Sequence, residues 1–264
     1  MLGRLRAAAR SVLPPKLLHL YRVVRHTTLW PTEPELVTAR QFLSPKTVAV
    51  DVGANFGLFT SVLARHAKSV IAFEPNRACA RYLTRVLPPN CDVIAKAVSD
   101  AIGMTTLRMP LEEGVALEAL ATIEGANHFD GIAAAEFVSQ PVETTTLDHV
   151  LLGQRQEGGR VSFINIDAEG HEFAVLRGGQ GLLVSDRPVL LIEIEYRHGS
   201  PVQEIFEWLQ KRRYVARALI EGTSLEYIDP VTLGRLQDGQ RLARRIAGDR
   251  RSGYVNNIFF LPEP

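Results

Sequence analysis

Residues 47–67 read TVAVDVGANFGLFTSVLARHA and contain a β-branched apolar run, a glycine turn and an apolar-patterned segment in direct succession. The first run is typical of a buried strand, and the apolar positions after Gly57 recur at helical spacing. A strand that passes through a glycine turn into a helix is the opening unit of a parallel α/β sheet. The stretch therefore predicts where the sheet begins.

The same alternation of strands and helices continues along the chain. We expect strands at 69–74, 91–100, 161–167, 188–195, 214–219 and 254–261, with helices at 77–87, 171–179 and 200–212. We also expect 104–110 to form a hairpin with the strand at 91–100. Alternating elements of this kind predict a mostly parallel sheet covered by helices on both faces, with ligands bound beyond the carboxyl ends of the strands.

Composition narrows the class of protein. The chain has 264 residues, 46% of them apolar, and a formal net charge of +1, which gives no general attraction to nucleic acid. Cys79 and Cys91 have no metal-like spacing and suit a reducing cytoplasm, so we expect a cytoplasmic protein. No apolar run is long enough to span a bilayer.

Three stretches lie outside the regular alternation. Residues 1–46 form a basic extension, which we interpret as a helix capping the domain of residues 47–264 or as a contact with an anionic membrane surface. The insert near 110–141 is rich in Ala and Gly. Long inserts in a compact α/β domain are often lids or substrate loops. The insert near 237–252 is basic and is either a solvated helix face or a phosphate-binding patch.

The glycine turn indicates the ligand. Its spacing is GxxxG rather than the GxGxxG of dinucleotide-binding proteins, and Asp51 directly before it would repel a phosphate. An acid there suits an amino group, and Glu74 at the end of the next strand suits ribose hydroxyls. A ligand with a ribose, a positive amino end and no phosphate is S-adenosyl-L-methionine.

The ordered motifs resemble those of the FkbM-type methyltransferase family. They are DVGANFGLFT (51–60), AFEPN (72–76), KAVSDAIG (96–103), VETTTLDHV (142–150), INIDAEGHEFAVLRGG (164–179) and PVLLIEIE (188–195). The resemblance implies a Rossmann-like, seven-stranded class I methyltransferase sheet with an antiparallel last strand. It also implies S-adenosyl-L-methionine as cofactor and O-methylation of hydroxyls on sugars, glycolipids or polyketides.

The resemblance also assigns cofactor-binding residues. It places Asp51, Gly53, Asn55 and Gly57 around the methionine end of the cofactor. It places Glu74 at the ribose, and the turn that contains Ser99 near the adenine. Two residues depart from the family pattern: Asn165 stands where Lys is usual, and Ala168 stands where Val is usual. We expect Asn165 to point away from the Asp167 face and to matter little for chemistry.

Acidic residues and a histidine follow the strand at 161–167. Asp167 is a candidate for contact with acceptor or cofactor, or else a carboxylate at a helix entry. His171 is a candidate base or a packing histidine, and Glu193 at the end of the next strand is a candidate for acceptor binding. For Glu169 and Glu172 we favour a role at the start of the helix.

Other functions remain as alternatives. A metal held by Asp167, Glu169 and Glu193 lacks a complete ligand set, so we predict no metal. The acceptor could instead be a nucleic acid or a protein, or the chain could bind cofactor without turnover. A nicotinamide-dependent oxidoreductase would need the GxGxxG turn that is missing. We expect a small-molecule or glycolipid acceptor, no nucleic acid and a possible membrane contact through the basic N-terminus; the sequence does not predict the oligomeric state.

Overall fold

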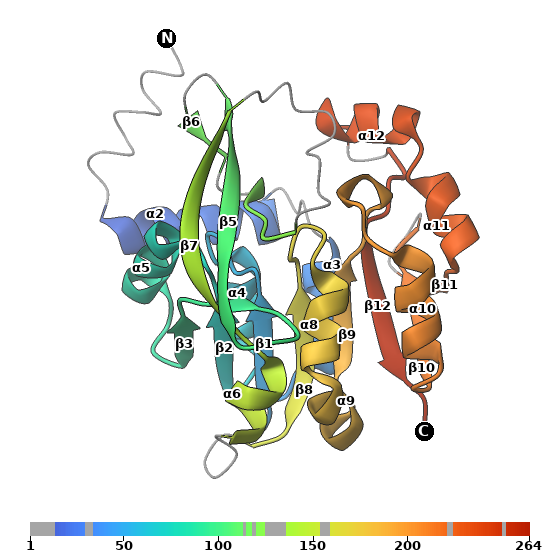
Figure 1. The fold of residues 1–264 in the computed structure, drawn as a ribbon, viewed down its shortest axis with the longest axis horizontal. Coiled ribbons are helices and arrows are strands. Elements are labelled where there is room, and N and C mark those ends of the chain that lie inside the picture. The colour runs from blue at the N-terminus through green and yellow to red at the C-terminus, as the bar shows by residue number, and fades with distance from the viewer. Residues whose placement is uncertain are drawn as a thin grey trace.

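The computed structural model describes residues 14–29, 34–112, 115–117, 120–124, 136–153, 159–220, 224–249 and 252–264. Its centre is an eight-stranded sheet in the order β11-β10-β12-β9-β8-β1-β2-β3 (Figure 1). The strands are β1 (Val48–Val52), β2 (Ser69–Phe73), β3 (Cys91–Ile94), β8 (Val161–Ile166), β9 (Val189–Glu193), β10 (Tyr214–Ala218), β11 (Glu226–Tyr227) and β12 (Asn257–Pro262).

The direction of the strands confirms the predicted fold class. Strands β3, β2, β1, β8 and β9 are parallel, whereas β12 is antiparallel to both β9 and β10. The sheet has eight strands rather than seven because the short β11 pairs antiparallel with the edge strand β10. This is the Rossmann-like sheet with an antiparallel last strand that the sequence predicts.

Helices cover both faces of this sheet (Figure 1). One layer contains α3 (Pro34–Ala39), α4 (Leu58–Leu63) and α5 (Arg77–Val86), and the other contains α6 (Leu147–Gly153), α8 (Glu172–Gly178), α9 (Gln180–Asp186) and α10 (Val202–Gln210). In β1, Val48, Val50 and Val52 pack toward the second layer, while Ala49 packs toward the first. Side chains alternate along a strand, so a continuous apolar run fills both interfaces.

A second, smaller sheet rises beyond the carboxyl ends of the central strands (Figure 1). It contains β4 (Ala97–Val98), β5 (Gly103–Glu112), β6 (Val115–Ala116) and β7 (Phe137–Thr145). The predicted hairpin between 91–100 and 104–110 is wrong, because β5 pairs antiparallel with β7, more than thirty residues further along the sequence. We call this second sheet the arm. The apolar residues Leu107, Met109 and Val142 pack together in its core.

The N-terminal extension contributes α3 to the first helical layer and packs α2 against α4 and α5 of that layer. Its elements are α2 (Pro15–Val24), the π-helix η1 (Arg25–Leu29), α3 and the short η2 (Arg40–Phe42). His19 of α2 bonds to Ser61 of α4 at 2.7 Å and contacts the Tyr82 hydroxyl of α5 at 3.3 Å. The division into residues 1–46 and 47–264 remains a prediction. Within the described ranges, no helix combines the length and the apolar composition needed to cross a bilayer.

Gly53 fixes the geometry where β1 and β8 separate. The strand order changes direction between these two strands, so their carboxyl ends open into a crevice. A β-carbon at Gly53 would lie 1.8 Å from the carbonyl oxygen of Asp167, and the residue has a left-handed φ of +81°. Only glycine permits both the turn and this close approach.

Glu172 holds the loop between β8 and α8 in place. Its Oε1 accepts hydrogen bonds from the backbone N–H groups of Ala168 (3.3 Å) and Gly170 (2.8 Å), and Oε2 accepts one from the Ser200 hydroxyl (3.0 Å). The side chain is fully buried, and burial raises the pKa of Glu172 to about 7. Glu172 therefore ties the loop to the segment after β9.

Glu172→Gln is expected to raise the free energy of unfolding at pH 8 and to change it little at pH 4. The raised pKa means that the folded chain holds the proton more tightly than the unfolded chain. That contribution is complete below the unfolded pKa of about 4.5 and is lost as the pH rises through about 7. Because glutamine does not ionise, the difference should reach roughly 2–3 kcal/mol above pH 7. Urea unfolding at both pH values, with the exposed Glu204→Gln as control, tests this; a difference independent of pH would contradict it.

Candidate functional site

A cavity opens at the carboxyl ends of β1, β2 and β8, beneath the arm. Its walls combine the glycine turn, the end of β2, the segment around β4, the β8–α8 loop and the arm with the chain beside it. The lining residues are Val52, Gly53, Asn55, Phe73, Glu74, Pro75, Lys96, Ala97, Val98, Leu107, Ala121, Ile123, Asp167, Ala168, Glu169 and His171. Part of the predicted insert therefore forms a wall of the cavity.

Asn55 and Glu74 present oxygen atoms to this cavity. The Glu74 carboxylate accepts hydrogen bonds from the backbone N–H groups of Asn55 (2.6 Å) and Asn76 (2.8 Å), which fix its orientation. Asn55 has a left-handed φ of +48°, and its buried Oδ1 has no hydrogen-bond partner among the described residues. A buried acceptor without a partner is costly, so this oxygen is suited to a donor on a bound ligand.

Asp51 lies below the cavity rather than in its wall. It is fully buried, and its carboxylate accepts hydrogen bonds from Thr60 (2.5 Å) and from the Asn165 side chain (2.9 Å). Burial raises the pKa of Asp51. Asp51 directly precedes the glycine turn, and its predicted contact with the methionine end of a cofactor stays a prediction.

The expectation for Asn165 is wrong. Residues two apart along a strand share a face, so Asn165 does not point away from Asp167 by alternation. It pairs with Asp51 in the register of β1 and β8, and its amide bonds the Asp51 carboxylate. Asn165 thus satisfies a buried acid that would otherwise lack one of its donors.

Gly57 and Ser99 also lie outside the lining. Gly57 begins α4 with a φ of +77°, and a β-carbon there would meet the Leu83 side chain of α5 at 2.6 Å. Ser99 bonds His171 through its hydroxyl at 2.9 Å. Gly57 serves helix packing and Ser99 orients a histidine, and their predicted places at the methionine and adenine ends of the cofactor stay predictions.

Asp167 and Glu193 form a coupled pair of acids. They share a side-chain hydrogen bond across the ends of β8 and β9, and Asp167 also lines the cavity. Burial raises the pKa of Asp167 well above its ordinary range, and the charges of Glu193 and Glu169 raise it further. Its Oδ1 is shielded from solvent and has no hydrogen-bond partner among the described residues. The two predicted candidates are thus brought together.

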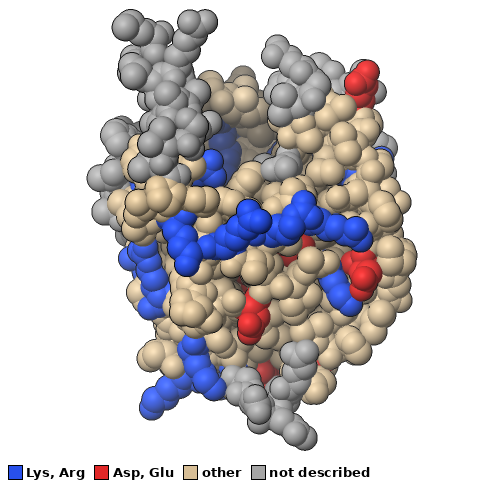
Figure 2. Space-filling model, turned by 90° about the vertical axis from the view of Figure 1, so that its left-hand side faces the viewer, with Lys and Arg blue, Asp and Glu red and all other residues tan. Residues whose placement is uncertain are grey.

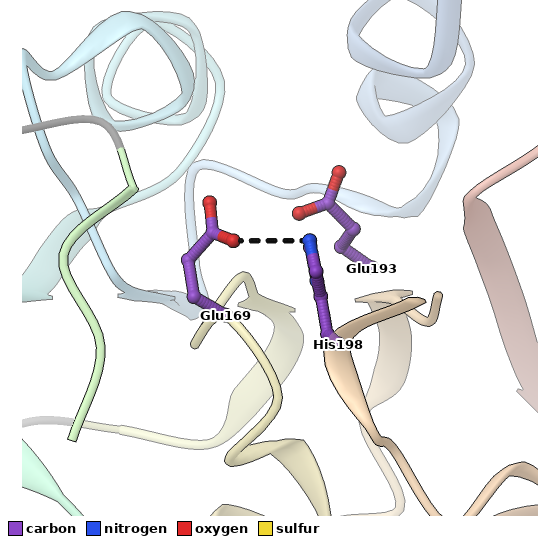
Figure 3. A group of neighbouring side chains, drawn as sticks. All are labelled: Glu169, Glu193 and His198. Carbon is purple, nitrogen blue, oxygen red and sulfur yellow. Dashed lines mark ion pairs between the residues drawn. The ribbon is translucent and has the colours of Figure 1, made fainter. Parts of the chain in front are cut away.

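Glu169 does not serve the helix start as expected, because α8 begins only at Glu172. Its φ is +51°, and its carboxylate lies 3.4 Å from Nε2 of His198 (Figure 3). Glu169, Glu193 and His198 each offer one ligand atom, and these atoms lie within 4.8 Å of one another. Burial, together with the charge of Arg197, lowers the pKa of His198 to about 4, so its ring is neutral at pH 7.

Glu195 and its partners border this group. Burial opposes a charge on Glu195, but the bonded Arg197 guanidinium outweighs burial and lowers its pKa. Tyr254 donates a hydrogen bond to Glu195 at 2.9 Å, and Asn256 bonds both Glu195 and Glu193. The C-terminal strand region therefore holds two of the acids in place.

His171 is held on both sides. Nδ1 lies 3.0 Å from the Glu124 carboxylate, and Nε2 lies 2.9 Å from the Ser99 hydroxyl. The ring lines the cavity, yet neither nitrogen points freely into it. Its geometry favours packing and anchoring of the insert over the role of a base, although its predicted catalytic role stays a prediction.

Several residues of the site were missed from the sequence. His198, Glu195 and Asn256 follow β9 or precede β12, and Thr122 of the insert donates to the backbone carbonyl of Glu169 at 2.8 Å. One signal in the sequence could have indicated His198. It lies in the segment YRHG (196–199), which directly follows the acidic end EIE (193–195) of the predicted strand. No pattern in the sequence indicates that 120–124 lies over the cavity.

This arrangement can bind a ligand along one wall and receive a proton on another. The acceptor oxygens of Asn55 and Glu74 line the glycine-turn side, and the carboxyls of Asp167 and Glu169 line the β8 side. A carboxylate with a raised pKa is a better proton acceptor than an ordinary one, which suits general base catalysis. The cavity therefore has the parts for a displacement that begins at a hydroxyl.

Three comparisons place the chain among known proteins. None of the curated proteins is significantly similar to it in sequence. The methyltransferase FkbM from Methylobacillus flagellatus KT is a similar solved structure, at 16% identity and a TM-score of 0.45, over 94% of this chain and 55% of that one. The chain thus spans little more than half the length of that protein.

Two further structures are similar at the same level. One is an rRNA methylase from Streptococcus thermophilus (16% identity, TM-score 0.39, 74% of this chain and 95% of that one). The other is a putative methyltransferase from Streptococcus mutans, solved in complex with SAH (12% identity, TM-score 0.40, 74% and 93%). With TM-scores below 0.5, these likenesses decide neither substrate nor mechanism.

The family follows from the sequence match. The model of the methyltransferase FkbM domain matches residues 51–216, which is more than half of the chain and runs from the glycine turn into β10. The matched region contains every residue of the cavity lining. The chain belongs to the FkbM methyltransferase domain family.

Proposed function

We propose that this methyltransferase transfers the methyl group of S-adenosyl-L-methionine to a hydroxyl of a small molecule, a sugar, glycolipid or polyketide. The observation that carries the proposal is that Oδ1 of Asn55 at the glycine turn, which has no hydrogen-bond partner among the described residues, lines the same cavity as Asp167 of the buried carboxyl pair at the end of β8. The first can bind the donor, and the second can receive the acceptor proton.

The residues of the cavity fit the donor. Glu74 is oriented by two backbone N–H groups, and a carboxylate at the end of the second strand suits ribose hydroxyls. Asn55 offers its unpartnered Oδ1 to an ammonium or hydroxyl donor. Val98 and Leu107 give an apolar surface suited to a flat ring. When bound, S-adenosyl-L-methionine supplies a methyl group already activated by its sulfonium.

The acid-rich wall supports an uncharged, hydroxylated acceptor. Carboxyl groups exchange hydrogen bonds with hydroxyls, whereas Asp167 and Glu169, whose carboxyl groups line the cavity, offer no positive charge to a phosphodiester backbone. The near-neutral chain also lacks the general basic character of nucleic-acid-binding domains. These features favour a sugar-like acceptor over a nucleic acid.

Asp167 is the best-placed proton acceptor in the cavity. We assign it the removal of the hydroxyl proton while the oxygen forms its bond to the methyl carbon and the carbon–sulfur bond breaks. The electron pair of that bond stays on sulfur, and the proton stays on the carboxyl. Glu193 is a positioning residue, because it acts through its hydrogen bond to Asp167.

The surface around α2 supports an acceptor linked to lipid. Leu17, Leu20 and Tyr21 of α2 are each about half exposed and share one face at helical spacing. A row of basic side chains crosses the face of the molecule on which α2 and α5 lie (Figure 2), and α5 exposes Arg77, Arg81 and Arg85. Apolar residues beside basic ones are the pattern of proteins that lie on anionic membranes.

Asn55→Gly is expected to weaken binding of S-adenosyl-L-methionine about 10- to 100-fold, as loss of one buried hydrogen bond does. Stability should change by less than about 1 kcal/mol, because glycine accepts the left-handed φ and the lost oxygen has no partner. Calorimetric titration measures the first and urea unfolding the second. Absence of binding to the wild type, or tight binding of NAD instead, would contradict the proposed donor.

Asp167→Asn should lower methyl transfer about 10²- to 10⁴-fold, the usual contribution of a general base. In the wild type, kcat/KM should rise with pH through the raised pKa of the Asp167–Glu193 pair, and the variant should lack that rise. Transfer of labelled methyl to a panel of glycans and glycolipids measures both. The exposed Asp92→Asn is the control, and full activity of Asp167→Asn would remove the assignment.

Replacing both Leu17 and Leu20 by serine should abolish sedimentation with vesicles that contain phosphatidylserine. Binding of the wild type should also weaken as salt is raised, because the basic row acts through screened charges. Val184→Ser, an exposed apolar residue of α9, is the matched control. If the wild type fails to sediment with anionic vesicles, the membrane contact is wrong while methyl transfer is unaffected.

A further inference from the structure

Three side chains from separate segments converge beside the cavity. Glu169 comes from the β8–α8 loop, Glu193 from the end of β9, and His198 from the short η4 helix (Tyr196–His198) that follows (Figure 3). Their ligand atoms all lie within 4.8 Å of one another, and Figure 3 shows the three side chains directed at a common point. Two carboxylates and an imidazole are ligand types that divalent transition metals accept together.

This group contains a buried imidazole as well as carboxylates. His198 is buried, with only 4% of its side chain exposed, and its Nε2 faces both Glu169 (3.4 Å) and Glu195 (3.9 Å). An imidazole nitrogen offers a lone pair that can bind a metal. Acidic residues often cluster on a protein surface because water solvates them. That explanation does not apply to His198, because its imidazole is buried and faces carboxylates.

An unpartnered oxygen lies next to the group. Asp167 bonds Glu193, but its shielded Oδ1 has no hydrogen-bond partner among the described residues. The carboxyl groups of Asp167, Glu169 and Glu193 lie close to one another here, and the nearby Arg197 guanidinium is bonded to Glu195. A bound cation would balance these charges and give Oδ1 a partner, directly or through water.

The loop geometry also holds the ligands in place. Glu169 adopts a left-handed backbone conformation, and the neighbouring Gly170 has a φ of +102° that brings its α-carbon close to the His198 backbone. Asn256 bonds Glu193, and Thr122 bonds the Glu169 carbonyl. Outer contacts of this kind orient metal ligands.

We propose that Glu169, Glu193 and His198 bind one divalent transition-metal cation, such as Mn²⁺ or Zn²⁺, at the acceptor end of the cavity. Three protein ligands leave coordination positions open for water or for an acceptor oxygen. The cation would then orient the acceptor hydroxyl toward the donor side. This last role rests on the proposed methyl transfer, whereas binding of the cation does not.

Titration of the metal-stripped full chain with MnCl₂, followed by the EPR signal of free Mn²⁺, tests the site. We expect one saturable Mn²⁺ per chain and a rise in Tm on binding, because the folded state alone holds the ligands together. His198→Asn and Glu169→Gln should each weaken binding about tenfold or more. ZnCl₂ should compete for the same site.

Matched substitutions outside the cluster provide the control. His149→Asn on α6 and Glu204→Gln on α10 are exposed changes of the same types and should leave Mn²⁺ binding unchanged. Thermal unfolding without metal identifies a variant that fails to fold. If His198→Asn does not fold, Mn²⁺ binding by Glu169→Gln provides the test of the site. Absence of saturable binding, or equal binding by cluster and control variants, overturns the proposal.

The same preparations separate this inference from the proposed function. A chain that binds S-adenosyl-L-methionine in calorimetry but no Mn²⁺ refutes the cation site and leaves methyl transfer standing. A chain that binds Mn²⁺ at the cluster but no S-adenosyl-L-methionine supports the site and refutes the donor assignment.

Discussion

The close approach of Gly53 to the carbonyl of Asp167 is the constraint on which the site depends. It occurs where β1 and β8 leave their shared register, and the Asp167 amide still bonds the Val52 carbonyl at 3.0 Å. Because no side chain stands between the two backbones, the glycine turn and the acidic loop lie side by side. The donor wall and the acid wall of the cavity are thus set by one contact.

Charge is distributed unevenly around this contact. Asp51 is buried with two donors, and Glu172 is buried with three, so both are supports for the backbone. Asp167 and Glu193 instead share a hydrogen bond and lie next to Glu169, which leaves acids facing one another. Buried acids with perturbed pKa values that face one another are typical of functional sites, whereas buried acids with enough hydrogen-bond donors support the fold.

The arm and the insert complete the cavity from outside the sheet. Thr122 and Glu124 bond the β8–α8 loop and His171, so a segment far away in sequence forms part of the wall. Variation in such segments changes an acceptor pocket without altering the sheet. This explains why the family assignment defines the reaction class more closely than the acceptor.

The sequence by itself determined the alternating strands and helices of the sheet and the place of the site at its carboxyl end, because apolar periodicity and glycine spacing are local properties of a chain. The antiparallel last strand was implied by the resemblance to the FkbM-type family. Among the predicted site residues, Gly53, Asn55, Glu74, Asp167 and His171 line the cavity, and their roles stay predictions. Only the tertiary structure decided that Asp51, Gly57 and Ser99 lie outside the lining of the cavity, that β5 pairs with β7, and that His198 meets Glu169 and Glu193. Those outcomes depend on which side chains converge from distant segments and on which buried groups find partners, and local patterns do not specify either.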